Sequence, residues 1–168
     1  KVHSPFPRAA DNLSRLRYRA VTMLAPTRLA VASDADHLIA FDRVAATDSR
    51  RSNLIRLRVA DSSAFIVPGP ADMPIGYALI NRFFFDHDFI ELVYIHPAHR
   101  RQGFGTALVA RCERESFTEK LFTSTNRSNT AMQVLLAKRG FVRSGVVKNL
   151  DENDVELIYL KRLPDRAG

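Results

Sequence analysis

The sequence has one cysteine, Cys112, no apolar run long enough to span a membrane, and no run of signal-peptide length near its N-terminus. A single cysteine excludes an intramolecular disulfide. The apolar neighbours of Cys112 on a predicted helix favour a place in the core over a role as a nucleophile. No internal repeat or low-complexity segment is found. These absences fit a reducing compartment, and we expect the protein in the cytoplasm.

Negative charge is in the minority, with 18 Asp and Glu against 25 Lys and Arg, a net charge of +7 and a pI of about 10.1. An excess of this sign is common in proteins that bind nucleic acids. The arginines are nevertheless spread along the chain, and no strand interleaves aromatic with basic residues as RNA-binding strands do. The charge therefore does not favour nucleic acid as the partner, and a polyanionic cofactor would account for part of it.

Hydrophobic residues make up 46% of the 168 positions, which suits one globular domain with a sizeable core. Residues 1–13 contain prolines and no periodicity, so we expect a flexible arm there and a single domain over residues 14–168. Strands are predicted at 16–24, 64–67, 75–85, 89–95, 120–125, 141–148 and 155–162. Helices are predicted over 27–45 with a break near Ser33, after a cap at Asp48, from about Gly103, and from a cap at Ser128 or Asn129 to Gly140.

The stretch from Glu91 to Leu108 carries the clearest chemical signal. A predicted strand, stopped by Pro97, leads through Arg-Arg-Gln-Gly-Phe-Gly at 100–105 into a helix. The first amides of a helix have no intrahelical acceptor, and the helix dipole adds partial positive charge to them. Glycine at 103 and 105 removes side-chain atoms that would keep an anion away from these amides. The stretch therefore predicts a phosphate or pyrophosphate site.

Two common phosphate-binding motifs do not fit this stretch. A dinucleotide-binding fingerprint needs Gly or Ala where Leu108 stands, and the Gly-Lys-Ser/Thr of a Walker A loop is absent. The sequence instead matches Arg/Gln-x-x-Gly-x-Gly/Ala at Arg100, Gly103 and Gly105. At these residues the chain resembles the GNAT superfamily of acyl-CoA-dependent N-acetyltransferases.

The resemblance extends from about Leu16 to Leu163 and is strongest over residues 76–141. Residues 123–161 also resemble an uncharacterised bacterial subgroup of these proteins. The resemblance implies an α/β (α+β) GNAT fold, with a mixed central sheet of about six to seven strands flanked by about four helices. It further implies that two parallel central strands, 89–95 and 120–125, splay apart.

The resemblance implies acetyl-CoA as cosubstrate and no metal. It also implies transfer of an acetyl group to a primary amine, of a small molecule or an exposed protein, by direct attack. Pantetheine would add along the strand at Val93 and Ile95, and Asn129, with Asn126 as a neighbouring candidate, would touch its arm. The pyrophosphate would be held at the turn, for which the cofactor-binding candidates are Arg100, Arg101, Gln102, Gly103, Phe104, Gly105 and Thr106.

The catalytic groups are less well defined than the cofactor site. Glu91 is the ionisable group on the inner part of its strand, and strict alternation would give it one face with Phe89, Val93 and Ile95. It could accept the amine proton there, or lie at an edge paired with an arginine. The family's usual Tyr, which protonates the leaving thiolate, is replaced by Leu136. Tyr94, Tyr159 or solvent would supply this proton; alternatively, the chain is an acyl-CoA-binding module with weak or no turnover.

Specificity for the acceptor is expected from the helices after the first strand, which wall the acceptor site in the family. The polar residues concerned are His37, Asp42, Arg43, Arg50 and Arg51. An acidic loop with Asp151, Glu152, Asp154 and Glu156 would suit a cationic amine, although a solvated hairpin turn fits it equally well. Asp86-His87-Asp88 is interpreted as a solvated turn and not as a metal site. Phe83–Phe85 would serve the core or a homodimer contact.

Overall fold

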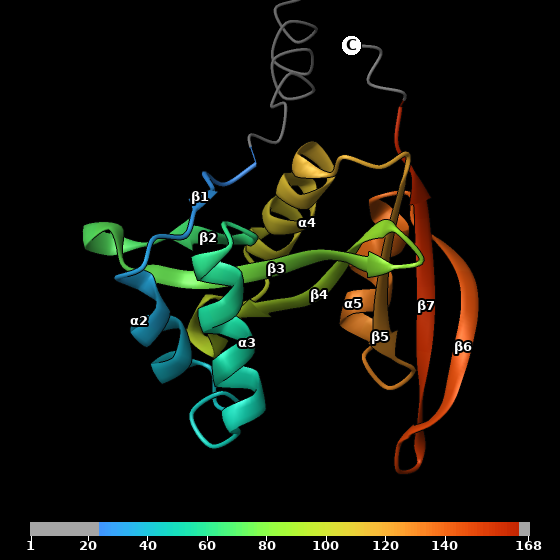
Figure 1. Cartoon of the computed structure of the whole chain (residues 1–168), viewed down its shortest axis with the longest axis horizontal. Helices are drawn as coiled ribbons and strands as arrows, with labels where there is room; N and C mark the ends of the chain where they lie inside the picture. Colours follow the sequence, from blue (N-terminus) through green and yellow to red (C-terminus); the bar gives the residue numbers. More distant parts are fainter. Residues whose placement is uncertain (1–23, 165–168) are drawn as a thin grey trace, which may run out of the picture.

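The central sheet of the computed structural model, which describes residues 24–164, has seven strands in the order β1-β2-β3-β4-β5-β7-β6 (Figure 1). The strands are β1 (Arg28–Leu29), β2 (Ala64–Pro68), β3 (Pro74–Phe84), β4 (His87–Ile95), β5 (Lys120–Asn126), β6 (Val142–Asp151) and β7 (Asp154–Arg162). The helices are α2 (Asp34–Phe41), α3 (Ser49–Ala60), α4 (Phe104–Glu115) and α5 (Thr130–Lys138), with single 3₁₀ turns at Pro70–Asp72 and Pro97–His99. Only β4 and β5 pair in parallel; the other neighbouring strands pair antiparallel.

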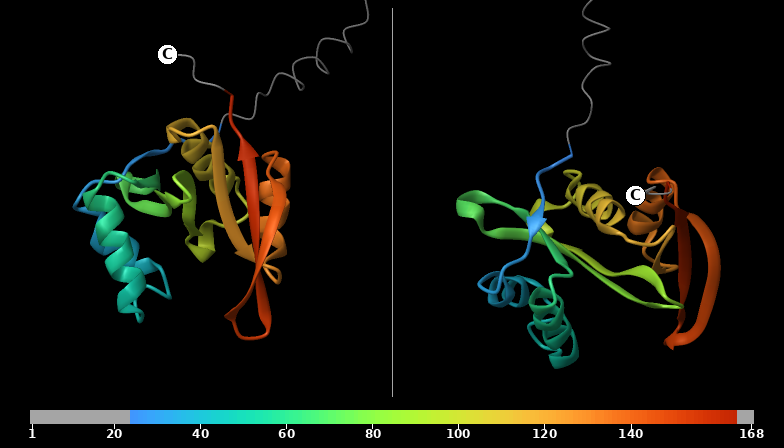
Figure 2. Two further views of the ribbon diagram at one scale, coloured as in Figure 1. Left: turned by 45° about the vertical axis from the view of Figure 1, so that its right-hand side comes forward. Right: turned by 45° about the horizontal axis from the view of Figure 1, so that its top comes forward.

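The two faces of the sheet carry separate hydrophobic clusters. Helices α2 and α3 cover one face and α4 and α5 the other, as the right-hand view of Figure 2 shows. Leu38, Ile55 and Tyr77 are fully buried on the α2–α3 face, and Leu108 and Leu136 on the α4–α5 face. A mixed sheet covered by helices on both faces confirms the predicted fold class.

Strands β4 and β5 separate after a short paired stretch. Their register joins Asp88 to Leu121 and ends at Ile90 and Thr123, where the Thr123 hydroxyl donates to the Ile90 carbonyl at 3.0 Å. Each strand continues beyond this point paired on its other side only, β4 with β3 and β5 with β7. Figure 1 shows the result: β3 and β4 run across the view while β5, β7 and β6 stand nearly upright. The predicted splay is present and begins at Ile90.

A bulge in β4 lies directly at this branch point. Leu79 pairs with Leu92 and Ile80 pairs with Ile90, so Glu91 is an extra residue in β4. Val93 on the C-terminal side of the bulge packs with the α4–α5 cluster, as Ile90 does, whereas Leu92 packs with the α2–α3 cluster. The bulge interrupts the strict alternation from which Glu91 was expected to share a face with Val93 and Ile95, so the orientation of Glu91 is given by its contacts and not by alternation.

The N-terminal predictions are tested only in part. The predicted arm at 1–13 and most of the predicted strand at 16–24 lie outside the described residues, and Leu24 itself is not in a strand. The predicted helix over 27–45 is wrong at its start, since β1 pairs antiparallel with β2 and α2 begins only at Asp34. The Asp34 carboxylate fixes the segment that leads into α2, because it accepts hydrogen bonds from the Val31 amide at 2.8 Å and from Arg28 at 2.7 Å.

The other helix ends match their predicted signals. Asp48 caps α3 by accepting from the Arg50 amide, and Asn129 caps α5 by accepting from the Met132 amide. Gly140, with φ of +81°, follows the end of α5 in the left-handed conformation that favours glycine. Asp48 thus marks the start of α3, and Asn129 and Gly140 mark the two ends of α5.

Candidate active site

The turn before α4 has the backbone shape that an anion site requires. Gly103 occupies the N-cap position with φ of +86°, and Arg101 also has a positive φ of +65°. A Cβ added at Gly103 would meet nothing within 4 Å, so the glycine is required by backbone conformation and not by lack of space. At Gly105 a Cβ would approach Leu135 Cδ1 to 3.0 Å, so this glycine serves the packing of α4 against α5. These contacts with the protein do not test the predicted role of both glycines, to clear the approach of an anion, which stays a prediction.

The amides of this turn remain available for a ligand. The first backbone hydrogen bond of α4 runs from the Ala107 amide to the Gly103 carbonyl at 3.1 Å. Within residues 24–164, no amide from Gly103 to Thr106 donates to a protein acceptor. A set of unsatisfied N–H groups at the positive end of a helix dipole fits a pyrophosphate.

Arg100 lies back across the end of β4. Its Nε donates to the Ile95 carbonyl at 3.1 Å, and its guanidinium lies 5.7 Å from the centre of the Tyr94 ring. Arg101 and Gln102 are exposed, while Phe104 is partly buried and packs against the α4–α5 cluster. The positive charge of Arg100 is therefore held beside the turn by the strand that the pantetheine would follow.

The two candidate asparagines have different surroundings. Asn129 uses its Oδ1 to cap α5, at 3.2 Å from the Met132 amide. Asn126 donates from Nδ2 to the Asp151 carboxylate at 2.7 Å, and so ties the end of β5 to the β6–β7 turn. Both lie at the end of β5 where the strands have parted.

Glu91 is paired with an arginine that sequence reasoning did not single out. Arg58 of α3 donates from Nε to Glu91 Oε2 at 2.5 Å and from Nη2 to Oε1 at 3.2 Å, and its Nη1 bonds Asp61 at 2.8 Å. Arg58 is 5% exposed. The hydrogen bonds to Glu91 and then Asp61 raise the pKa of Arg58, although burial opposes the shift. The bulge thus turns Glu91 towards α3, where a buried cation holds its carboxylate.

The two candidate tyrosines lie on opposite faces of the sheet. Tyr94 packs with the α2–α3 cluster, stacks on Phe41 at 5.9 Å, and donates its hydroxyl to the Phe41 carbonyl at 3.5 Å. Tyr159 is 7% exposed within the α4–α5 cluster, which also contains the fully buried Leu136. The structure therefore brings Tyr159, but not Tyr94, to the side of Leu136.

Asp42 has a structural role that the sequence did not reveal. It is fully buried and accepts from the Tyr77 hydroxyl at 2.5 Å and from Arg51 Nε at 2.8 Å. The amides of Val44 and Ala45 also donate to it, at 2.9 and 3.2 Å. Burial first, and then the bond to Asp42, raise the pKa of Tyr77. Asp42 anchors the α2–α3 loop to β3, so it is neither solvated nor open to an acceptor.

Asp86-His87-Asp88 is not the solvated turn that the sequence suggests. The turn is made by Phe85 and Asp86, both with positive φ, and β4 begins at His87. Asp88 is 4% exposed and accepts from the Ser116 hydroxyl and the Phe117 amide, which anchors the α4–β5 loop. Burial alone would raise the pKa of Asp88, but these hydrogen bonds outweigh it and lower the pKa.

Within residues 24–164, no group of three or more His, Cys, Asp or Glu residues could hold a metal ion. No helix in the same region is long and apolar enough to cross a membrane. Cys112 is fully buried, and burial raises the pKa of its thiol, which confirms its place in the core.

Comparison with known proteins identifies the fold. The model of the Acetyltransferase (GNAT) family matches residues 26–141. A GNAT family acetyltransferase from Bacillus cereus has 31% sequence identity, covers 83% of this chain and 98% of its own, and superposes with a TM-score of 0.77. No curated protein sequence matches the chain.

More distant solved structures share the fold alone. The protein yncA from Salmonella typhimurium, solved with its cofactor acetyl-CoA, is 18% identical, covers 85% of this chain and 96% of its own, and has a TM-score of 0.68. Ribosomal-protein-alanine N-acetyltransferase from Brucella melitensis is 22% identical, with coverage of 82% and 99% and a TM-score of 0.66. The family match over most of the described residues, the splayed strands and the glycine turn agree: the chain belongs to the GNAT family and is an acyltransferase whose cosubstrate is acetyl-CoA.

Proposed function

We propose that this acyltransferase moves an acetyl group from acetyl-CoA to a primary amine, of a small molecule or an exposed protein, by direct attack. The observation that carries the proposal is the parting of β4 and β5 at Ile90 and Thr123 beside the open amides of the turn before α4. The free edge of β4 beyond Ile90 would accept pantetheine as an added strand along Val93 and Ile95. The amides from Arg101 to Thr106 would hold the pyrophosphate.

Acetyl-CoA, when bound, supplies an acetyl group activated as a thioester. The chain must then provide a neutral amine, since an ammonium group has no lone pair with which to attack. We assign Glu91 as the group that accepts the proton of the substrate amine. It is the first residue of β4 beyond the last pair with β5, so it lies where the splay begins. The two hydrogen bonds from Arg58 leave its carboxylate with further acceptor capacity.

The proton for the departing thiolate has no protein donor at the usual place, because the residue there is Leu136, whose apolar side chain is also fully buried. Tyr159 packs in the same apolar cluster, and the Tyr94 hydroxyl is directed to the Phe41 carbonyl. We therefore propose solvent as the source, since a thiol with a pKa of about 8.5 leaves tolerably as the thiolate.

A second candidate function follows from the same residue. With Leu136 in place of an acid, and with Glu91 engaged by Arg58, the chain would bind acyl-CoA with weak or no turnover. The two functions differ in a single measurement, the amine-dependent release of free thiol from acetyl-CoA. Release with at least one amine supports the enzyme, whereas micromolar binding of acetyl-CoA without release from any amine supports the binding module.

The panel of amines should sample both acceptor classes. It should include small polyamines, because Asp151, Glu152 and Asp154 surround the β6–β7 turn. It should also include a peptide with an N-terminal alanine, because one structural neighbour is a ribosomal-protein-alanine N-acetyltransferase. We also propose the cytoplasm as the site of action, on the basis of the free and buried Cys112.

A further inference from the structure

A cavity lies towards the C-terminal end of α4, away from the cofactor turn at its N-terminus. It has a volume of about 460 Å³ and is lined by residues from the end of α3, the loop before β2, the C-terminal part of β3 and the last turn of α4. The first residue of α4 that lines it, Arg111, follows the N-cap Gly103 by eight residues, so at about 1.5 Å per residue the cavity and the turn are about 12 Å apart along the helix. Its volume falls within the range of small-molecule sites, roughly 300–1,000 Å³.

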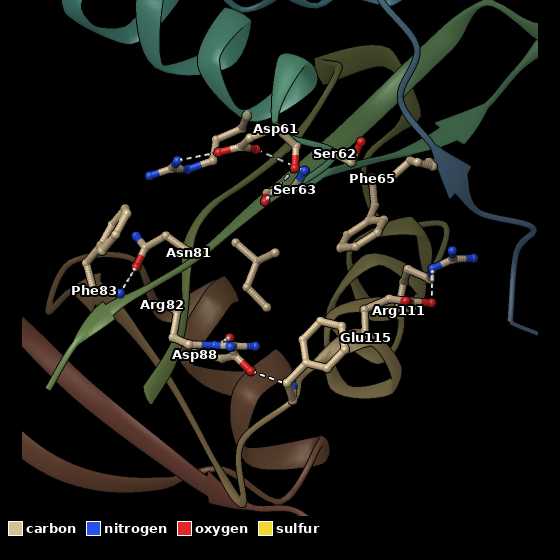
Figure 3. Close-up of a pocket in the computed structure, with 14 residues that line it drawn as sticks. Asp61, Ser62, Ser63, Phe65, Asn81, Arg82, Phe83, Asp88, Arg111 and Glu115 are labelled. Atoms are coloured by element: carbon tan, nitrogen blue, oxygen red, sulfur yellow. Dashed lines mark hydrogen bonds and ion pairs between the residues drawn. The ribbon is translucent and has the colours of Figure 1, made fainter. Parts of the chain in front are cut away.

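Three phenylalanines, Phe65, Phe83 and Phe117, lie among the mostly polar residues that line this cavity. Figure 3 shows Asn81 and Phe83 on one side and Phe65 and Arg111 on the other, with Asp61 to Ser63 at one end and Arg82 and Asp88 at the other. Phe65 is buried, whereas Phe83 and Phe117 at the rim are each 80% exposed. Two phenylalanine rings left almost wholly in water beside one cavity present apolar surface that a bound ring would cover.

An arginine guanidinium lies over each of the three phenylalanine rings, Phe65, Phe83 and Phe117. The guanidinium carbon of Arg58 lies 5.5 Å from the centre of the Phe83 ring, that of Arg82 lies 5.0 Å from Phe117, and that of Arg111 lies 5.1 Å from Phe65. Planar cations stacked on planar rings form layers against which a third flat group packs well. The shape of the lining therefore favours a planar ligand.

The carboxylates around the cavity already have partners. Asp61 accepts from Arg58 and from the Ser63 amide, and Glu115 pairs with Arg111 at 3.0 Å. Asp88 accepts from Ser116 and from the backbone of the α4–β5 loop. These acidic groups have their charge offset and their oxygens engaged, so the cavity offers few acceptors for a cationic ligand.

Donors, in contrast, remain unused. Arg82 is half exposed and makes one ion pair, through Nε to Asp88 at 3.4 Å, so its two terminal nitrogens have no protein acceptor within residues 24–164. The Oδ1 of Asn81 accepts a hydrogen bond from the Phe83 amide at 2.7 Å, and its Nδ2 can still donate. A ligand that complements this lining must bring acceptors, and the paired terminal nitrogens of Arg82 match the two oxygens of a carboxylate.

From these contacts we infer that the cavity binds a small planar aromatic carboxylate, as a site separate from the acetyl-transfer site. The carboxylate meets Arg82 and the ring lies between Phe65, Phe83 and Phe117. The inference does not depend on the identity of the amine acceptor, because Arg82 and the three phenylalanines lie outside the cofactor turn and the splay. Arg58 touches both sites, since it lines the cavity and also holds Glu91.

The test is calorimetric titration of the full chain with 2-naphthoate in the presence of saturating coenzyme A, which blocks the cofactor site. Two comparison ligands measure the contributions of the carboxylate and of the aromatic ring to affinity. 2-Naphthamide keeps the ring without the charge, and cyclohexanecarboxylate keeps the charge without the aromatic ring. We expect 2-naphthoate to bind at least about tenfold more tightly than either comparator. Arg82→Gln should weaken it about tenfold, with coenzyme A affinity and Tm unchanged, and Phe117→Ser should weaken it by a similar factor.

Arg143→Gln, which removes a charge from the exposed strand β6, is the matched control and should leave 2-naphthoate affinity unchanged. The inference is overturned if 2-naphthoate does not bind beside coenzyme A, or if 2-naphthamide binds as tightly. It is equally overturned if folded Arg82→Gln binds 2-naphthoate as the wild type does. Because the comparison of the three ligands needs no variant, misfolding of Arg82→Gln would still leave a decisive result.

Discussion

Arg58 holds Glu91 at the point where β4 bulges and leaves β5. The two side chains meet through a pair of hydrogen bonds, 2.5 and 3.2 Å long, between α3 and the central sheet. The bulge supplies the extra residue, and the buried guanidinium holds its carboxylate in one orientation. This relationship places a carboxylate beside the opening that the cofactor would fill.

Glu91→Gln tests the assigned role most simply, since it keeps the side chain's size and removes its ability to take a proton. We expect kcat for the best amine to fall by a factor of about 10²–10⁴, with acetyl-CoA affinity unchanged. Steady-state thiol release and calorimetry measure the two quantities. Glu119→Gln, at an exposed position before β5, is the control. Turnover of Glu91→Gln close to that of the wild type would remove Glu91 from the mechanism.

Arg58→Gln should cost both stability and activity. It leaves Glu91 and Asp61 without the cation that joins them, and breaking a buried ion pair by removing one partner costs about 3 kcal/mol of unfolding free energy. Denaturant unfolding measures the loss. Arg50→Gln, whose side chain lies in solvent, should change stability by less than about 0.5 kcal/mol. Equal stabilities for the two variants would show that the Arg58–Glu91 pair contributes nothing.

The lowered pKa of Asp88 predicts how the free energy of unfolding changes with pH. Its pKa is lowered in the folded state, so its contribution is present above the unfolded value of about 3.9 and is lost as pH falls through the folded pKa. Asp88→Asn should therefore be less stable than the wild type at pH 7, and the gap should narrow as pH falls below about 4. Thermal unfolding across this range measures the gap; a gap that does not change with pH would contradict the assignment.

The tyrosines give a prediction about the leaving group. Tyr94→Phe and Tyr159→Phe should each retain kcat within about threefold, since loss of a positioned acid would cost about 10²-fold or more. A fall of that size in Tyr159→Phe would identify a protein acid beside Leu136 and would replace solvent in the mechanism. Circular dichroism should confirm that each variant is folded.

Much of the fold could be predicted because its signals are local. Pro97 and Gly103 mark the end of a strand and the start of a helix, and Asp48 and Asn129 cap helices by bonds to amides two or three residues away. The placement of Glu91 could not be predicted, because a bulge depends on the register between β3 and β4. The helix predicted from residue 27 failed for a similar reason, since β1 is fixed by its pairing with β2.

In the candidate site, too, the features with local sequence signals could be predicted and the contacts between distant elements could not. The turn proposed for the cofactor follows from a contiguous motif that ends in Gly103 and Gly105, so it could be proposed from sequence. Arg58 lies 33 residues before Glu91, and only the packing of α3 on the sheet brings them together. Asp42 and Tyr77 are joined in the same way across the α2–α3 face. No periodicity or motif in the sequence marks such pairs, which are contacts between elements.

The central claim is that the turn before α4 binds the phosphates of acetyl-CoA through its backbone. Calorimetric titration with acetyl-CoA, with NADH as the control ligand, tests it on the wild type, on Gly103→Glu and on Gly145→Ala. Gly103→Glu forces a side chain into a left-handed backbone and places a carboxylate at the phosphate site. Gly145→Ala adds a methyl group in ordinary contact with Ile158, at 3.8 Å, on the far β6–β7 hairpin. We predict that the wild type and Gly145→Ala bind acetyl-CoA with micromolar affinity and that Gly103→Glu does not; binding by folded Gly103→Glu as tight as that of the wild type would contradict the account.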